Sequence, residues 1–149
     1  MGPAPRRVGV IGAIGTGKTT AARLLAGYTG APLIIADEVA RELAQPGGPL
    51  AGALAQVFPG LDRAGIAGRI FTDPDARRRF AAVTDPPMMA ELCRRLTDIA
   101  GPLVIIEGVN LPQLLPEGIS DWLEIIAPED IALVRAAAAH AWPPATVCA

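Results

Sequence analysis

Four short apolar runs set the framework of this 149-residue chain. The runs 8–11, 33–36, 103–106 and 122–126 are nearly continuous, which is typical of strands buried on both faces of a parallel sheet. Segments rich in helix-forming residues separate them, so the order of elements alternates between strand and helix. This pattern predicts an α/β fold in which helices cover both faces of a parallel sheet.

The segments between the runs predict where the helices lie. One helix is predicted from Lys18 to about Tyr28, ending at the stop signal Thr29-Gly30, and an Ala-rich helix from Pro128 to about His140. No strand pattern occurs within 50–100, so we expect a helical insertion there within a single domain spanning 1–149. Breaks between its helices are predicted at three sites rich in proline, glycine or aspartate: Pro59-Gly60, Thr72-Asp73-Pro74 and Asp85-Pro86-Pro87.

The turn after the first predicted strand carries the most specific motif of the chain. Residues 12–19 have a glycine, four further residues and then Gly-Lys-Thr, between a strand and a helix, which is the pattern of a phosphate-binding loop. Glycines let the backbone turn its N–H groups toward phosphate, and the next helix adds the positive end of its dipole. The motif predicts a nucleotide site formed by Gly12, Ala13, Ile14, Gly15, Thr16, Gly17, Lys18, Thr19 and Thr20.

Lys18 is the only lysine among the 13 basic residues of the chain. A compact ammonium on a flexible stem fits among phosphates where a planar guanidinium does not, so its retention here supports a catalytic role. We expect Lys18 to contact the β- and γ-phosphates of ATP and the Thr19 hydroxyl to ligate Mg²⁺. The alternative is a glycine-rich turn that happens to precede a lysine, and the surrounding strand and helix disfavour it.

Two carboxylates follow predicted strands, at the edge where α/β sheets bind ligands. Asp37 could accept a proton from a substrate hydroxyl or hold Mg²⁺ through water, and the alternative is an N-cap for a helix over 38–44. Glu107 follows the run 103–106 and could support the metal or contact substrate, or be an ordinary acid at a strand end.

Arg41, in the helix predicted over 38–44, is a further candidate for substrate binding. The alternative is that Glu38 and Arg41 pair along their own helix. The run Arg77-Arg78-Arg79 has two interpretations as well: a solvated helix face, which we favour, or a site for an anionic ligand.

Composition narrows the classes of partner. The net charge is -2 and the sequence pI is about 5.3, so no nucleic-acid surface is expected. No apolar run approaches the length of a membrane span, and the first residues are too interrupted for a secretion signal. Cys93 and Cys148 fit no metal spacing and predict free thiols, which indicates a cytoplasmic protein. The tail 142–149 is not expected to continue the last helix.

Several segments together resemble the dephospho-coenzyme A kinase family. They are the phosphate loop, residues 36–43 followed by Gln45-Pro46-Gly47, and Leu61-Asp62-Arg63 with Arg69-Ile70-Phe71 and Asp73-Pro74. The resemblance runs from Val8 to about Arg135. It implies a P-loop kinase fold of three layers, ATP-dependent transfer to the ribose 3′-hydroxyl of dephospho-CoA, Asp37 near that hydroxyl, and a substrate-binding role for residues 50–100.

The chain departs from this family pattern at several positions. Ile35 and Asp85 stand where the family commonly has Asp and His, and Gly108 to Pro112 replace a Pro-Leu-Leu segment. The family places lid arginines after the last helix, whereas four alanines follow Arg135 here. We therefore expect the lid arginines to be missing and a partner chain or a second copy to complete the site.

Two other functions stay open at this stage. The departures favour a nucleotide-binding regulatory module that lacks efficient transfer, or a degenerate fragment of a kinase. The segment Ile105 to Asn110 also resembles the strand-end motif of pantothenate and uridine kinases, which would imply a different small-molecule acceptor.

Overall fold

The computed structural model describes residues 5–140, and these contain one four-stranded parallel sheet. Its strands are β1 (Arg6–Ile11), β2 (Leu33–Ile35), β3 (Leu103–Glu107) and β4 (Asp121–Glu124), in the order β2-β3-β1-β4. All four strands lie within a few residues of the predicted runs, and their parallel pairing confirms the α/β class. The predicted tail 142–149, with Cys148, lies outside the described residues.

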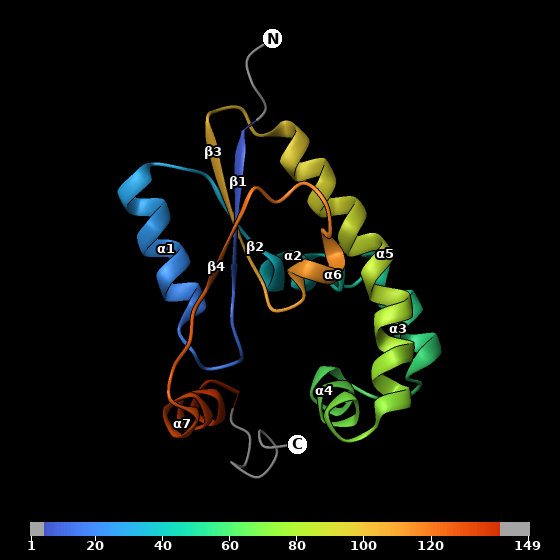
Figure 1. The fold of residues 1–149 in the computed structure, drawn as a ribbon. Helices are drawn as coiled ribbons and strands as arrows, with labels where there is room; N and C mark the ends of the chain where they lie inside the picture. Colours follow the sequence, from blue (N-terminus) through green and yellow to red (C-terminus); the bar gives the residue numbers. More distant parts are fainter. Residues whose placement is uncertain (1–4, 141–149) are drawn as a thin grey trace.

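Helices cover both faces of the sheet, which confirms the three-layer prediction (Figure 1). Alternate residues of β3 face opposite layers, because Ile105 packs with Ala22 of α1 while Val104 and Ile106 pack with Leu92 of α5. The short α6 was not predicted. The helices are α1 (Lys18–Thr29), α2 (Ala36–Leu43), α3 (Pro49–Val57), α4 (Arg63–Thr72), α5 (Pro74–Asp98), α6 (Leu111–Leu114) and α7 (Glu129–His140).

The predicted helical insertion corresponds to α3, α4 and α5, with no strand between Pro49 and Asp98. These helices share a small core of their own around Phe58, Ile66 and Ala76, separate from the cores on the two sheet faces. Figure 1 shows α4 beyond the lower end of the sheet, which is the end where α7 also lies. The role of this region in substrate binding remains a prediction.

The predicted helix break at Asp85-Pro86-Pro87 is wrong, because α5 continues through both prolines. A proline removes one backbone hydrogen bond and normally destabilises a helix interior. Here a buried row spaced four residues apart keeps the helix against its neighbours: Thr84, Met88, Leu92 and Leu96. The breaks at Pro59-Gly60 and Thr72-Asp73-Pro74 are confirmed, and the Asp73 side chain caps α5 by accepting from two backbone N–H groups.

The run Arg77-Arg78-Arg79 is exposed, as predicted, but each guanidinium has a partner within the chain. Arg77 donates to the carbonyl oxygens of Ile70 and Phe71 at 3.0 and 3.2 Å. Arg78 pairs with Asp75, and Arg79 lies over the Phe58 ring at 5.8 Å. Arg77 therefore links α5 to the end of α4, and Arg79 links α5 to the end of α3, whereas the Arg78 pair lies within α5. Among the described residues, no helix combines the length and the apolar character that a bilayer crossing requires.

Candidate functional site

The phosphate loop joins β1 to α1 and lies against two later segments of the chain. Gly12 has φ +155, and a Cβ added there would lie 2.5 Å from the Ile125 carbonyl oxygen. Gly15 has φ +82, and a Cβ there would overlap the carbonyl oxygen of Ala132 in α7. Only glycine fits either position, because the backbone conformation and the close approach both exclude a side chain. The loop is thus held between the end of β4 and the first turns of α7.

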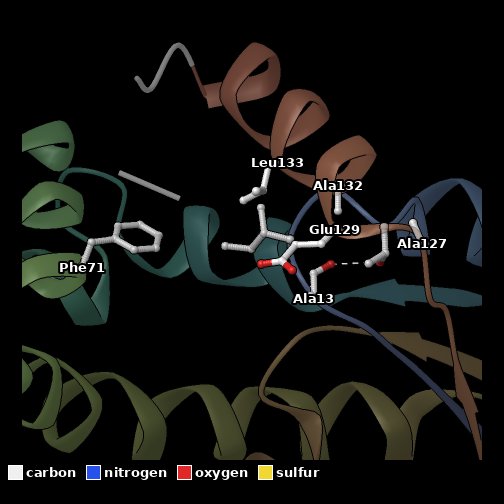
Figure 2. A pocket seen from close by; sticks show the side chains of 8 residues that line it. Ala13, Phe71, Ala127, Glu129, Ala132 and Leu133 are labelled. Carbon is white, nitrogen blue, oxygen red and sulfur yellow. Dashed lines mark hydrogen bonds between the residues drawn. The ribbon is translucent and has the colours of Figure 1, made fainter. Parts of the chain in front are cut away.

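Thr16 shapes this loop from within. Its side chain is buried, and its hydroxyl donates to the Ala13 carbonyl oxygen at 2.9 Å (Figure 2). The backbone N–H of Thr16 donates to the same oxygen at 3.4 Å. Ala13 and Ile14 are consequently held at the outer surface of the loop, where they line a cleft described below.

Thr19 and Glu107 meet at the centre of the site. Thr19 is the second residue of α1, and its hydroxyl donates to Glu107 Oε2 at 3.0 Å. Glu107 ends β3, where it is paired with Val10 and Ile35 on the flanking strands and is only 3% exposed. The two candidates, far apart in the sequence, are therefore adjacent in space.

The charges around Glu107 come from other candidate residues. Burial raises the pKa of Glu107 above its ordinary value, and the charge of Asp37 raises it further. The hydrogen bond from Thr19 and the charges of Lys18 and Arg23 act in the opposite direction without cancelling that rise. The structure thus brings Lys18, Thr19, Asp37 and Glu107 to one edge of the sheet.

Asp37 is not an N-cap, so that alternative is wrong. Helix α2 begins at Ala36, directly after β2, and Ile35 occupies the capping position. Ala36 is buried in the core. Asp37 lies in the first turn of α2 and is exposed. It forms no hydrogen bond or ion pair with any other residue that the structure describes, so its carboxylate is available to a ligand.

The alternative in which Glu38 pairs with Arg41 along α2 is also wrong. Glu38 instead pairs with Arg23 of α1 at 3.2 Å, which links the helices that follow β1 and β2. The two helices start at the same edge of the sheet, so this longer-range contact competes with the pair along one helix. Arg41 is exposed and forms no ion pair within the described part of the chain, and its role remains a prediction.

The oxygen atoms at this edge fit a magnesium ion. Mg²⁺ prefers hard oxygen ligands and usually keeps several waters, binding through one or two protein groups together with phosphate oxygens. The Thr19 hydroxyl and the Glu107 carboxylate are groups of this kind, and they already face each other. Residues 5–139 contain no cluster of three acidic, histidine or cysteine side chains able to enclose a metal, so phosphate and water would supply most of the ligands.

A cleft of about 350 Å³ opens beside the loop (Figure 2). One wall is the loop itself, the second is the start of α7, and Phe71 at the end of α4 faces them from the helical insertion. Sequence reasoning did not single out Glu129, which points into this cleft, and it noted Phe71 only as part of the family resemblance. The lining residues are Ala13, Ile14, Thr16, Phe71, Ala127, Glu129, Ala132 and Leu133.

A parallel sheet whose first strand leads into a phosphate loop, with acids after two neighbouring strands, defines the class of P-loop phosphotransferases. The comparison with known proteins then identifies the family within that class. A family model described as dephospho-CoA kinase matches residues 6–135. The chain belongs to the dephospho-CoA kinase family, which confirms the resemblance found in the sequence.

Curated relatives agree with this assignment. The dephospho-CoA kinase of Methylococcus capsulatus is 34% identical over 140 residues, covering 86% of this chain and 69% of that protein. That of Anaeromyxobacter dehalogenans is 36% identical over 138 residues, covering 85% of this chain and 65% of that protein. The chain thus spans about two thirds of the length of these relatives.

Solved structures support the fold. TT1252 from Thermus thermophilus superposes with a TM-score of 0.77 at 29% identity, covering 98% of this chain and 78% of that one. A gluconokinase from Sinorhizobium meliloti has a TM-score of 0.51 at 16% identity, covering 99% and 73%, and is similar in fold alone.

Proposed function

We propose that this chain transfers the γ-phosphate of ATP to the ribose 3′-hydroxyl of dephospho-CoA. The observation that carries the proposal is the meeting of a phosphate loop, the Thr19–Glu107 pair and an unpaired Asp37 at one edge of the sheet. The relatives named dephospho-CoA kinase supply the acceptor. Pantothenate or uridine kinase activity is the alternative acceptor choice, and the family assignment disfavours it.

In this proposal each residue has one task. The amides of residues 12–20 and the Lys18 ammonium hold the phosphates and offset charge that spreads over the transferred group. Asp37 accepts the proton of the acceptor hydroxyl while the hydroxyl oxygen forms a bond to the γ-phosphorus of ATP. At the same time the bond between the γ-phosphorus and the oxygen that bridges it to the β-phosphate breaks, and ADP leaves. Thr19 and Glu107 would hold Mg²⁺, which neutralises phosphate charge when bound.

The remaining parts of the proposal concern partners and location. The helices over 50–100 would hold the acceptor as a substrate-binding insertion in the single domain 1–149, with Arg41 contributing a positive charge. The protein would act in the cytoplasm, in keeping with the exposed free thiol of Cys93. A second copy or a partner chain would supply charge above the loop.

Product formation tests the proposed transfer. The purified protein is incubated with ATP, Mg²⁺ and dephospho-CoA, and 3′-phosphorylated product is measured by mass. We expect product from the unaltered protein, a loss of about 10²–10³-fold in Lys18→Ala, and a loss of about 10²–10⁴-fold in Asp37→Asn. Asp37→Asn should fold normally, because the side chain is exposed and unpaired. Equal yields from the unaltered protein and Lys18→Ala would reject the proposal.

A nucleotide-binding module without efficient transfer is the second candidate. Helix α7 packs on the loop through Ala132, yet Arg135 is its only lysine or arginine and four alanines follow it. A site short of cations would bind nucleotide and depend on an arginine from a partner for rapid transfer. Calorimetric titration with ATP separates the two candidates, because binding in the micromolar range without turnover favours the module.

A further inference from the structure

Asp37 depends on the backbone around it for its position. Its exposed side chain has no partner among the residues that the structure describes, and it lies in the first turn of α2, a helix of 8 residues. No side chain caps that turn, because Ile35 in the capping position has no polar group to offer. The first N–H groups of a helix without a cap fray easily, so contacts from other elements must hold this turn in place.

Two kinds of contact hold the first turn of α2. Ala36 and Val39 are buried in the core between the sheet and α5. Glu38 accepts a hydrogen bond from the guanidinium of Arg23, on α1, at 3.2 Å. The two buried residues lie on one stripe of the helix, so their packing alone allows the turn to rock about that stripe. The ion pair with α1 comes from the side and restrains this motion.

Arg23 also offsets the negative charge gathered at this edge of the sheet. Burial is the main cause of the raised pKa of Glu107, the charge of Asp37 adds to the rise, and the charge of Arg23 opposes it. Arg23 is thus within electrostatic reach of the site. Lys18 is the other cation whose charge lowers the pKa of Glu107, and in the proposed function phosphate occupies it. Arg23 is then the cation left to hold the acids of α2 near Glu107.

We infer that Arg23 and Glu38 are positioning residues for Asp37, because their ion pair sets the orientation of the first turn of α2 relative to the phosphate loop. Neither residue contacts a substrate in this account. Exposed ion pairs contribute little to stability, but displacing a catalytic group by about 1 Å can lower a rate about 10²-fold. The inference rests on the proposed function, in which Asp37 accepts the proton, and deepens it.

The other end of α2 has an ion pair that serves as a matched control. Glu42 pairs with Arg95 of α5, which also pairs with Glu91. This contact also links α2 to a neighbouring helix, but it lies more than one helical turn beyond Asp37. Glu42→Gln therefore makes the same chemical change as Glu38→Gln, in the same helix, without disturbing the first turn.

Steady-state kinetics with ATP, Mg²⁺ and dephospho-CoA test the positioning role. In Arg23→Gln and Glu38→Gln we expect kcat to fall about tenfold, with KM for ATP unchanged within about twofold, because the phosphate loop is intact. Glu42→Gln should keep kcat within about twofold, and Arg23→Lys should recover part of the loss. If kcat falls in Arg23→Gln but not in Glu38→Gln, Arg23 acts through its charge alone and the inference is overturned.

A double-mutant cycle tests whether the pair acts through Asp37. In the Asp37→Asn background the proton acceptor is already lost, so adding Glu38→Gln should lower kcat no further. The same fold-loss in both backgrounds would show that the pair acts on another part of the site, and would overturn the inference.

Amide hydrogen exchange, followed by NMR, tests the positioning without any turnover. The N–H groups of Ala40 and Arg41 bond to carbonyl oxygens of the first turn in a regular helix. We expect their exchange to be about threefold faster in Arg23→Gln and Glu38→Gln and unchanged in Glu42→Gln. Unchanged exchange in the first two variants would overturn the inference whatever the activity.

These outcomes are distinguishable from failure of the proposed function. Inorganic tripolyphosphate has the phosphates of ATP but no base; by calorimetry, Glu38→Gln should bind it normally and Lys18→Ala more weakly. If the unaltered protein forms no 3′-phosphorylated product, the proposed function fails, and amide exchange still decides whether the pair fixes the turn. If Lys18→Ala behaves as expected while Arg23→Gln and Glu38→Gln keep full kcat, only the positioning inference fails.

Discussion

The sheet edge and the helical region α3–α5 shift the pKa of a glutamate in opposite directions. At the sheet edge, burial raises the pKa of Glu107, and the single hydrogen bond from Thr19 does not compensate. In α5, hydrogen bonds from Arg94 and Arg95 lower the pKa of Glu91 to about 2. The first region holds a polar group at an energetic cost, which is typical of reactive sites, while the second uses the same group to stabilise helices.

Among the changes that compare these two regions, the largest effect is expected at Lys18, where a change of shape at constant charge should remove most of the activity. We expect Lys18→Arg to lower kcat by about 10²–10³-fold, because the planar guanidinium cannot take the place of the ammonium among the phosphates. Steady-state kinetics measure kcat, and thermal unfolding checks that the variant is folded.

A matched change in the helical region sharpens that result. Arg94→Lys keeps the charge of an exposed ion-paired residue in α5 and should leave kcat unchanged within about twofold. If Lys18→Arg retains full kcat, the sheet edge is no more demanding of side-chain shape than α5.

Gly15→Ala should cost about 2–3 kcal/mol of unfolding free energy and weaken tripolyphosphate binding. The positive φ disfavours alanine, and its Cβ would overlap the carbonyl oxygen of Ala132, so the loop must move away from α7. Gly27→Ala is the control, because Gly27 is in α1 with nothing within 4 Å of an added Cβ. That change should instead stabilise the protein by up to about 1 kcal/mol. Equal effects in chemical denaturation would contradict the account of the loop.

Local sequence was sufficient to predict the sheet edge. The phosphate loop, the strands and the acids at 37 and 107 follow from short-range patterns, since a turn of this kind needs glycines at fixed spacing. The roles of these residues are still predictions, but their meeting at one edge follows from parallel pairing.

Features that depend on distant contacts were not predictable. The fate of Pro86 in α5 is decided by buried side chains around it rather than by proline itself. Glu38 finds Arg23 instead of Arg41 because two helices start side by side. Phe71 and Glu129 share a cleft only after α4 and α7 are brought together, and neither carries a local signal of that contact.

Pro86→Ala tests whether packing alone keeps α5 continuous through its prolines. Pro86 is exposed in the interior of α5, so alanine restores a backbone donor without disturbing the core. We expect a gain of about 2 kcal/mol in unfolding free energy, less than the full proline penalty because the unfolded chain also gains freedom. Product formation should not change. A loss of stability would show that the proline contributes a contact that the packing needs.

Glu91→Gln should lower stability in a pH-dependent way, by at most about 1 kcal/mol, as is usual for ion pairs at a surface. The pKa of Glu91 is lowered from 4.5 to about 2, so its stabilisation is complete above 4.5 and lost as pH falls toward 2. The deficit of the variant should therefore be full at pH 6 and vanish near pH 2. Urea denaturation across this range measures it.

Glu107→Gln should change the unfolding free energy in the opposite direction to Glu91→Gln as pH rises. The difference between this variant and the unaltered protein should be smallest at low pH. Because the pKa of Glu107 is raised above 4.5, the folded state keeps a proton that the unfolded chain has released, and unfolding free energy falls as pH rises through that window. The glutamine variant has no such loss, so its stability relative to the unaltered protein should increase above pH 4.5 and then level off. The same variant should bind Mg²⁺-ATP more weakly than the unaltered protein. If Glu107→Gln instead becomes less stable than the unaltered protein as pH rises, as Glu91→Gln is expected to do, the two regions do not differ. The buried Glu107 carboxylate would then stabilise the fold rather than destabilise it.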